Sequence, residues 1–222
     1  MKQPILFINL KTCKEGTGAR ALKLAKTAEL QAKKFNKIIV IVAQTADIRM
    51  IASKFSLPVF AQHIDSISFG AHTGFILPEA VRKAGAIGTV LNHAEHKLSG
   101  KELRECIKRA KEAGLIVMAC AESISRAEKI ASMNPDFIAI EPPELIGGNI
   151  SVSTAKPSLI TNSIKAIHSI KKIPVIAGAG IKKKEDVEIA IELGCKGVFV
   201  SSGIVKASNQ KNAMKEMLEG MQ

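Results

Sequence analysis

Short runs of apolar residues recur eight times along the chain, separated by segments with a different pattern. Each run is too short for a stable helix and too continuously apolar for a strand with one face in water. This pattern predicts parallel β-strands that are buried on both faces. The runs occupy residues 5–9, 38–42, 58–62, 88–92, 115–121, 137–141, 174–180 and 197–202.

Amphipathic segments lie between these runs. Residues 19–35, 99–114 and 183–194 repeat apolar side chains with helical periodicity, and the last two segments end in a glycine, as helices often do. The helix expected between the second and third strands is short, and the third strand–helix unit looks irregular.

The alternation of strands and helices predicts an α/β fold with right-handed parallel crossovers. Eight repeats favour a closed (β/α)₈ TIM barrel over an open sheet. The 222 residues are close to the lower limit of about 200 residues for such barrels. Because no linker or break in composition interrupts the pattern, we expect one compact domain over residues 1–222.

Composition narrows the possible functions. The net charge is +12, but the chain has no Trp or Tyr and its Phe residues are scattered, so no stacking surface for nucleic acid is predicted. No apolar run is long enough to span a bilayer, and the start lacks the pattern of a signal peptide. The four cysteines are far apart without metal-binding spacing, which favours reduced thiols. We therefore expect a cytoplasmic protein without a metal, a membrane contact or a nucleic-acid partner.

Polar residues follow several of the predicted strands. Active sites of such barrels form at the carboxyl ends of the strands, so these residues are candidates for chemistry. Asn9 and Lys11 follow the first strand, His93 the fourth, and Glu141 ends the sixth. An ammonium buried without a partner is costly, and Glu95 is the candidate partner for Lys11.

Small residues after the last two strands suggest a phosphate site. Gly180 ends the sequence GAG, which lacks the third glycine and the acidic residue of a dinucleotide fingerprint. Together with Ser201 and Ser202, it lies where barrels expose backbone N–H groups to phosphate. A base, an electrophile, a cation and a phosphate cradle indicate proton abstraction next to a carbonyl of a small phosphorylated substrate.

Seven motifs in order resemble the triosephosphate isomerase family, in its shorter archaeal form. They are INLKT (8–12), AQHID (61–65), GAHTG (70–74), LNHAEH (91–96), EPPELIGG (141–148), GAGI (178–181) and SSGIVKA (201–207). The resemblance covers the whole chain. It implies interconversion of dihydroxyacetone phosphate and glyceraldehyde 3-phosphate through an enediolate, without cofactor or metal.

The resemblance also implies residue roles. Glu141 would be the base, His93 would polarise the carbonyl as the neutral imidazole known in this family, Lys11 would stabilise negative charge, and Asn9 would bind the substrate oxygen. Glu144, by contrast, would belong to a lid that begins with two stiff prolines. The phosphate would lie on Ile146, Gly147, Gly180, Ser201 and Ser202.

Thr73 matches a family loop that crosses a dimer interface and supports the partner's Asn and Lys. We therefore expect a homo-oligomer. The short chain, as in the archaeal form of the family, favours a tetramer, and a dimer is the alternative. His63 and Asp65 are expected to organise the loop after the third strand.

Three positions depart from the family pattern. Ala94 replaces a serine whose hydroxyl is thought to hold the base in the open state of the lid, residues 147–149 read Gly-Gly-Asn instead of Gly-Thr-Gly, and Cys13 replaces an aromatic residue. Two alternatives stay open at this point: another phosphate-binding barrel isomerase or epimerase, and a degenerate barrel without catalysis that acts as a basic interaction protein.

Overall fold

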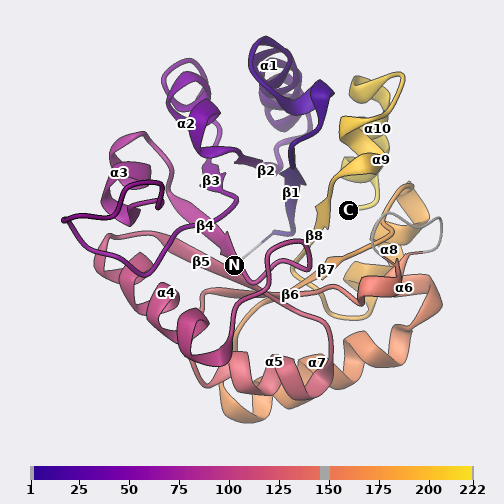
Figure 1. Ribbon diagram of the computed structural model, residues 1–222. Helices are drawn as coiled ribbons and strands as arrows, with labels where there is room; N and C mark the ends of the chain where they lie inside the picture. Colours follow the sequence, from indigo (N-terminus) through magenta and orange to yellow (C-terminus); the bar gives the residue numbers. More distant parts are fainter. Residues whose placement is uncertain (1–2, 146–150, 222) are drawn as a thin grey trace.

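A computed structural model describes residues 3–145 and 151–221 and has a closed barrel of parallel strands in sequence order (Figure 1). The predicted (β/α)₈ fold and all eight predicted strands are confirmed, with strand ends that differ by at most two residues. The strands are β1 (Ile5–Asn9), β2 (Ile38–Ala43), β3 (Val59–Ala61), β4 (Gly88–Leu91), β5 (Ile116–Ala121), β6 (Phe137–Ile140), β7 (Val175–Gly178) and β8 (Gly197–Val200).

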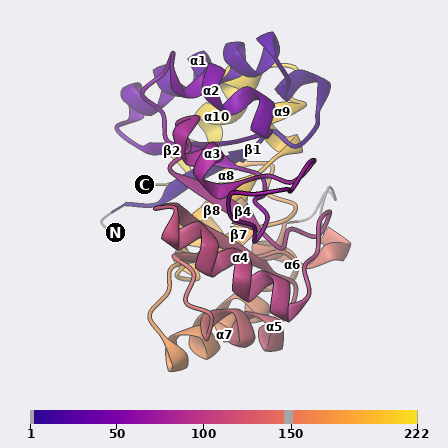
Figure 2. The same cartoon turned by 60° about the vertical axis from the view of Figure 1, so that its left-hand side comes forward.

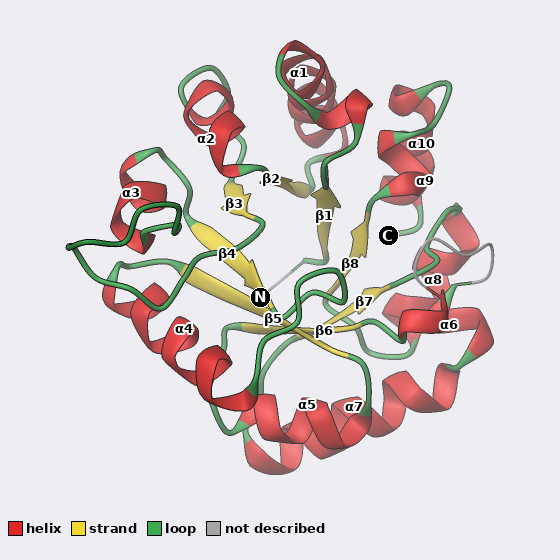
Figure 3. Ribbon diagram, viewed as in Figure 1, coloured by secondary structure: helices red, strands yellow, loops and turns green. Residues whose placement is uncertain are grey.

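Helices surround the barrel, as Figure 3 shows. The third unit is irregular, as predicted, because residues 62–77 connect β3 to a helix of only six residues. The α-helices are α1 (Ala19–Phe35), α2 (Thr45–Ala52), α3 (Pro78–Lys83), α4 (Gly100–Glu112), α5 (Ile124–Ala131), α6 (Val152–Ala155), α7 (Pro157–Ile170), α8 (Lys184–Glu192), α9 (Ser202–Val205) and α10 (Gln210–Glu219). Two 3₁₀ turns complete the described elements, η1 (Lys14–Gly16) and η2 (Pro143–Leu145).

Two hydrophobic cores stabilise the barrel, because successive strand residues point to opposite faces. Leu6 and Ile8 pack outward under the helices, whereas Phe7 belongs to the core inside the barrel. The Phe7 ring meets Phe60 and Phe137 edge-to-face, with ring centroids 5.6 Å apart in both pairs. These aromatic contacts fill the interior, so the barrel is a packed core and its chemistry lies at the rim.

Glycines complete the barrel where space or backbone conformation requires them. A Cβ on Gly197 would lie 2.1 Å from the Ile5 carbonyl oxygen, at the pairing of β8 with β1 that closes the sheet. The predicted helix ends at Gly114 and Gly194 have left-handed φ values of 73° and 101°. In Figure 2 the loop after β3 projects from one side of the barrel. Among the described residues, no helix is both long and apolar enough to cross a bilayer.

Candidate active site

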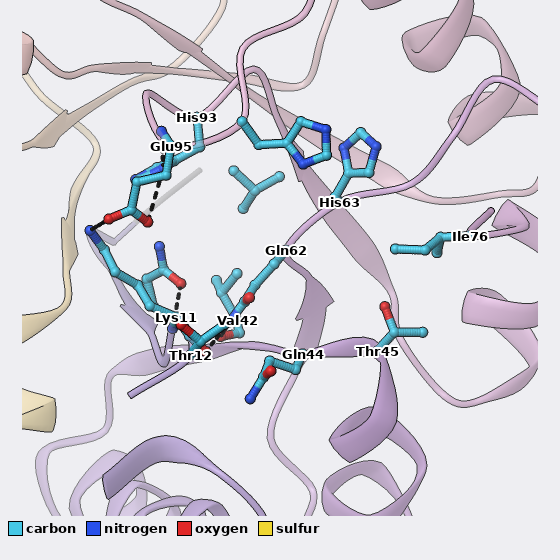
Figure 4. Close-up of a pocket in the computed structure, with 13 residues that line it drawn as sticks. Lys11, Thr12, Val42, Gln44, Thr45, Gln62, His63, Ile76, His93 and Glu95 are labelled. Carbon is cyan, nitrogen blue, oxygen red and sulfur yellow. Dashed lines mark hydrogen bonds and ion pairs between the residues drawn. The ribbon is translucent and has the colours of Figure 1, made fainter. Parts of the chain in front are cut away.

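Lys11 lies at the mouth of the barrel, just beyond β1, in a left-handed conformation with φ of 47°. Two contacts hold this turn: the Lys11 N–H donates to Asn9 Oδ1 at 3.0 Å, and Gln62 Nε2 donates to the Lys11 carbonyl at 2.9 Å. The ammonium pairs with Glu95 Oε1 at 2.7 Å (Figure 4). The structure therefore holds a cation at the rim and places the expected carboxylate on it.

The imidazole of His93, in the loop after β4, has a protonation state set by the backbone. Its Nδ1 lies 3.1 Å from the Glu95 backbone N–H, which donates to it. Because a backbone N–H can only donate, this bond requires the tautomer in which Nδ1 has no proton and Nε2 has one. Nε2 faces Glu141 Oε1 at 3.7 Å. An N–H donor therefore points toward the centre of the rim.

Glu141 extends the ladder of β6 by one bond, because its N–H donates to the Ala121 carbonyl at 2.9 Å. The residue is only 5% exposed, and its Oε2 atom has no hydrogen-bond partner among the described residues. Burial and the Glu141 carboxylate both raise the pKa of the neighbouring Cys120 thiol well above its ordinary value. A buried carboxylate with an unpaired oxygen is costly, and such groups concentrate at functional sites.

Space for this carboxylate comes from a glycine on the next strand. A Cβ on Gly178 would lie 2.4 Å from Glu141 Cγ and 2.9 Å from Oε1. Real Cβ atoms do not approach carbon atoms so closely, so the present position of the carboxylate requires glycine there.

A cavity at the rim brings most of the predicted site residues together. It measures about 30 Å³, and a larger cavity of about 350 Å³ shares three residues with it, Asn9, Lys11 and His93. Figure 4 shows the larger one. Predicted site residues that line the smaller cavity are Asn9, Lys11, His93, Glu141, Gly180, Ser201 and Ser202.

The turn after β7 and the start of α9 expose backbone to the smaller cavity. Ala179 and Gly180 both have φ of 72°, and α9 begins at Ser202. Successive N–H groups at turns of this kind, and the first N–H groups of a helix, suit an anion. Ile146 and Gly147, the other two residues predicted to contact phosphate, lie outside the described residues, as do Gly148 and Asn149.

Glu144 is separated from this site. It lies in η2, is exposed, and pairs with Lys156 at the start of α7. The hydrogen bond from Lys156 lowers the pKa of Glu144 below its ordinary value. The two glutamates of the sequence EPPE thus have different surroundings: Glu141 is buried at the end of a strand, and Glu144 is in water.

The loop after β3 is organised by His63 and Asp65, in agreement with the sequence prediction. Asp65 Oδ2 accepts from the Ile76 N–H at 2.6 Å, and Asp65 Oδ1 lies 3.3 Å from His63 Nε2. His63 stacks on His96 with ring centroids 4.1 Å apart. Burial, and then the neighbouring His96, lowers the pKa of His63.

Thr73 does not join the site of its own chain. It lies on an exposed stretch of the loop after β3, between Phe69 and Phe75, which are 69% and 58% exposed. Two large apolar side chains on a projecting loop are unusual for a surface that stays in water.

Sequence reasoning missed three residues that hold the site together. Gln62 and Asn92 lie inside the family motifs, and the motifs alone predict no role for them, although an amide at a strand end is a usable signal. The sequence predicts that Gly178 belongs to a phosphate-binding turn, and nothing in it indicates that this glycine makes room for a side chain from another strand. Cys120 is buried.

Residues 3–145 and 151–221 include no group of three or more His, Cys, Asp or Glu side chains arranged to hold an ion. All four cysteines are free thiols, as predicted.

Comparisons with known proteins identify the family of the chain. The sequence model of the triosephosphate isomerase family matches residues 4–219. The triosephosphate isomerase of Methanobacterium bryantii is 44% identical over 216 residues, which cover 97% of this chain and 96% of the relative. The enzyme of Methanothermus fervidus is 40% identical over 222 residues, the full length of both chains.

A solved structure has the same fold. The triosephosphate isomerase of Bartonella henselae superposes with a TM-score of 0.76 over 98% of this chain and 97% of that chain, at 16% identity. At this low identity the likeness concerns the fold alone. The family match and the archaeal relatives show homology in sequence as well. The chain belongs to the triosephosphate isomerase family.

Proposed function

We propose that the protein interconverts dihydroxyacetone phosphate and D-glyceraldehyde 3-phosphate at the rim cavity. The observation that carries this proposal is the buried Glu141 carboxylate, which has one unpaired oxygen and faces the Nε2–H of a neutral His93. A carboxylate base beside a neutral N–H donor suits proton transfer at a carbon next to a carbonyl.

In the proposed reaction, Glu141 removes a proton from the carbon next to the carbonyl. The electron pair moves onto the carbonyl oxygen and gives an enediolate, which the Nε2–H of His93 stabilises by a hydrogen bond. Lys11 and Asn9 stabilise the negative charge and the substrate oxygen from the opposite wall. Protonated Glu141 then returns its proton to the adjacent carbon, while a hydroxyl proton passes between the two oxygens.

The same proposal assigns phosphate binding to Gly180, Ser201 and Ser202. Their position on the cavity that also holds Glu141 supports this assignment. Ile146 and Gly147 are proposed to complete the cradle. We propose that the lid predicted after Glu141 closes over the substrate. Closure would exclude water and strengthen these interactions, because Coulomb energies grow as the dielectric falls.

A coupled assay with glyceraldehyde 3-phosphate tests the assignment. Glu141→Gln should lower kcat by about 10²–10⁴-fold, the usual contribution of a general base. Glu144→Gln is the matched control, because it makes the same change on the exposed glutamate, and it should affect turnover much less. Equal and severe losses would refute the separate roles. Phosphate binding without turnover would favour a degenerate barrel, and turnover of another phosphorylated sugar would favour a different isomerase or epimerase.

We also propose that the protein is a homo-oligomer, a tetramer or at least a dimer. The exposed Phe69 and Phe75 on either side of Thr73 support an interface on this loop. Light scattering should give a mass of at least two chains, and Phe75→Asp should lower it. A monomeric wild type would refute this part of the proposal.

Finally, we propose one domain over residues 1–222 and a cytoplasmic location. The family match over residues 4–219 and the closed barrel support the single domain. Four free thiols are typical of a reducing compartment.

A further inference from the structure

Asn92, the residue before His93, has a backbone conformation that few residues adopt. Its φ is 59°, and it is only 4% exposed. For a residue with a Cβ this conformation is unfavourable, and glycine would adopt it freely. Contacts of the buried Asn92 side chain are therefore expected to compensate for this backbone conformation.

The side-chain amide of Asn92 makes three contacts that hold the loop after β4. Its Nδ2 donates to the Cys120 carbonyl on β5 at 2.8 Å. Its Oδ1 accepts from the Leu98 N–H at 3.0 Å and from Arg126 Nη2 at 3.3 Å. One amide thus connects the start of the loop to its end, to the neighbouring strand and to α5.

Arg126 acts on the far end of the same loop. Its Nη2 also donates to the Leu98 carbonyl at 2.9 Å. The guanidinium therefore contacts both the Asn92 amide and the residue that the amide holds. This closes a ring of hydrogen bonds around the segment from residue 92 to residue 98.

The segment inside this ring fixes the imidazole of His93. The His96 N–H donates to the His93 carbonyl at 2.8 Å, and the Glu95 N–H donates to Nδ1 at 3.1 Å. The second bond keeps the proton on Nε2. If the loop loosened, the Glu95 N–H would leave Nδ1, and the imidazole would be free to exchange tautomers and to rotate.

We propose that Asn92 is the positioning residue for His93. With Arg126 it holds the loop in the one conformation that presents Nε2–H to the reacting carbonyl. The effect on turnover rests on the proposed isomerase function, whereas the effect on the tautomer does not. Asn92 touches no reacting atom, and it acts through the loop.

Asn92→Gly is the principal test, because glycine keeps the left-handed backbone without strain and removes only the amide. We expect kcat to fall about 10–100-fold, in the range set by a loosened catalytic group. KM and competitive inhibition by inorganic phosphate should change less than twofold, because the phosphate contacts are on the opposite side of the rim. Asn36→Gly is the matched control: Asn36 also has a left-handed φ, 49°, but is exposed at the end of α1, and kcat should not change.

Nitrogen-15 shifts of the His93 ring give a readout that does not depend on turnover. The wild type should show one neutral tautomer with the proton on Nε2, and Asn92→Gly should show an exchanging mixture. Arg126→Gln should produce a smaller loss of kcat, about threefold to tenfold, and it leaves the left-handed backbone of Asn92 unchanged. This variant replaces Asn92→Gly as the test if Asn92→Gly does not fold.

Two results would overturn the inference. One is a kcat within twofold of wild type together with an unchanged His93 tautomer. The other is a parallel weakening of phosphate inhibition and kcat, which indicates general loss of structure. A wild type without isomerase activity would refute the proposed function instead, and the nitrogen-15 shifts would still decide the positioning role.

Discussion

Gly178→Ala should displace the catalytic base while leaving the barrel intact. The added Cβ would lie 2.4 Å from Glu141 Cγ, whereas carbon atoms in contact stay about 3.5–4.0 Å apart, so a movement of about 1 Å is needed. The backbones of β6 and β7 are held by their ladder, and the Glu141 side chain is the part that can move. A misplacement of about 1 Å reduces catalysis by about 10²-fold, or about 2.7 kcal/mol of transition-state stabilisation.

The assay compares kcat and thermal unfolding of Gly178→Ala with those of a second glycine variant. Gly100→Ala is the control, because its Cβ would have no neighbour closer than Arg126 Nη1 at 3.8 Å, an ordinary contact. We expect a loss of about 10²-fold only for Gly178→Ala, with unfolding midpoints of both variants close to wild type. A Gly178→Ala enzyme with kcat within threefold of wild type would refute the steric argument.

Three further predictions concern thiols, pH and closure of the barrel. Burial raises the pKa of Cys106 to about 11 and that of Cys195 to about 12, and Cys120 is also buried. Iodoacetamide at about pH 8 should therefore alkylate the half-buried Cys13 alone in the folded protein, and a second adduct in the mass spectrum would contradict this. Burial, and then His96, lowers the pKa of His63, so the unfolded chain binds this proton more readily and stability should fall as pH drops below about 6.5. His63→Gln should flatten this dependence in urea titrations, and equal slopes would count against it. Gly197→Ala should lower the free energy of unfolding by at least about 2 kcal/mol in the same titrations, because its Cβ would meet the Ile5 carbonyl, and an unchanged midpoint would show that the strand pairing adapts.

The barrel could be predicted because its determinants are local in the sequence. In a strand such as β1, Leu6 and Ile8 pack outside the barrel and Phe7 packs inside it, so both faces are apolar. Such a strand is recognisable in the sequence as a continuous apolar run. The position of a strand end then predicts which polar residues reach the rim. The same rule predicts that His93 and Glu141, at the ends of the fourth and sixth strands, lie near one another.

Contacts between distant strands could not be read in the same way. The role of Gly178 depends on a side chain 37 positions earlier in the chain, and that of Gln62 on a carbonyl 51 positions away. A glycine or an amide at a strand end has many uses, and only the closed barrel decides which partner it meets. The two glutamates of EPPE were easier to separate, because Glu141 ends a predicted strand and Glu144 follows two prolines.

Ala94 connects the sequence to the state of the base. The resemblance predicts that a family serine would hold the base in the open state, and this chain has no hydroxyl at that position. In the structure, Glu141 Oε2 is buried without a hydrogen-bond partner among the described residues. A buried carboxylate oxygen without a partner is costly, so other contacts have to hold Glu141 in this position. The position of the base therefore depends on packing, above all on the space that Gly178 leaves free.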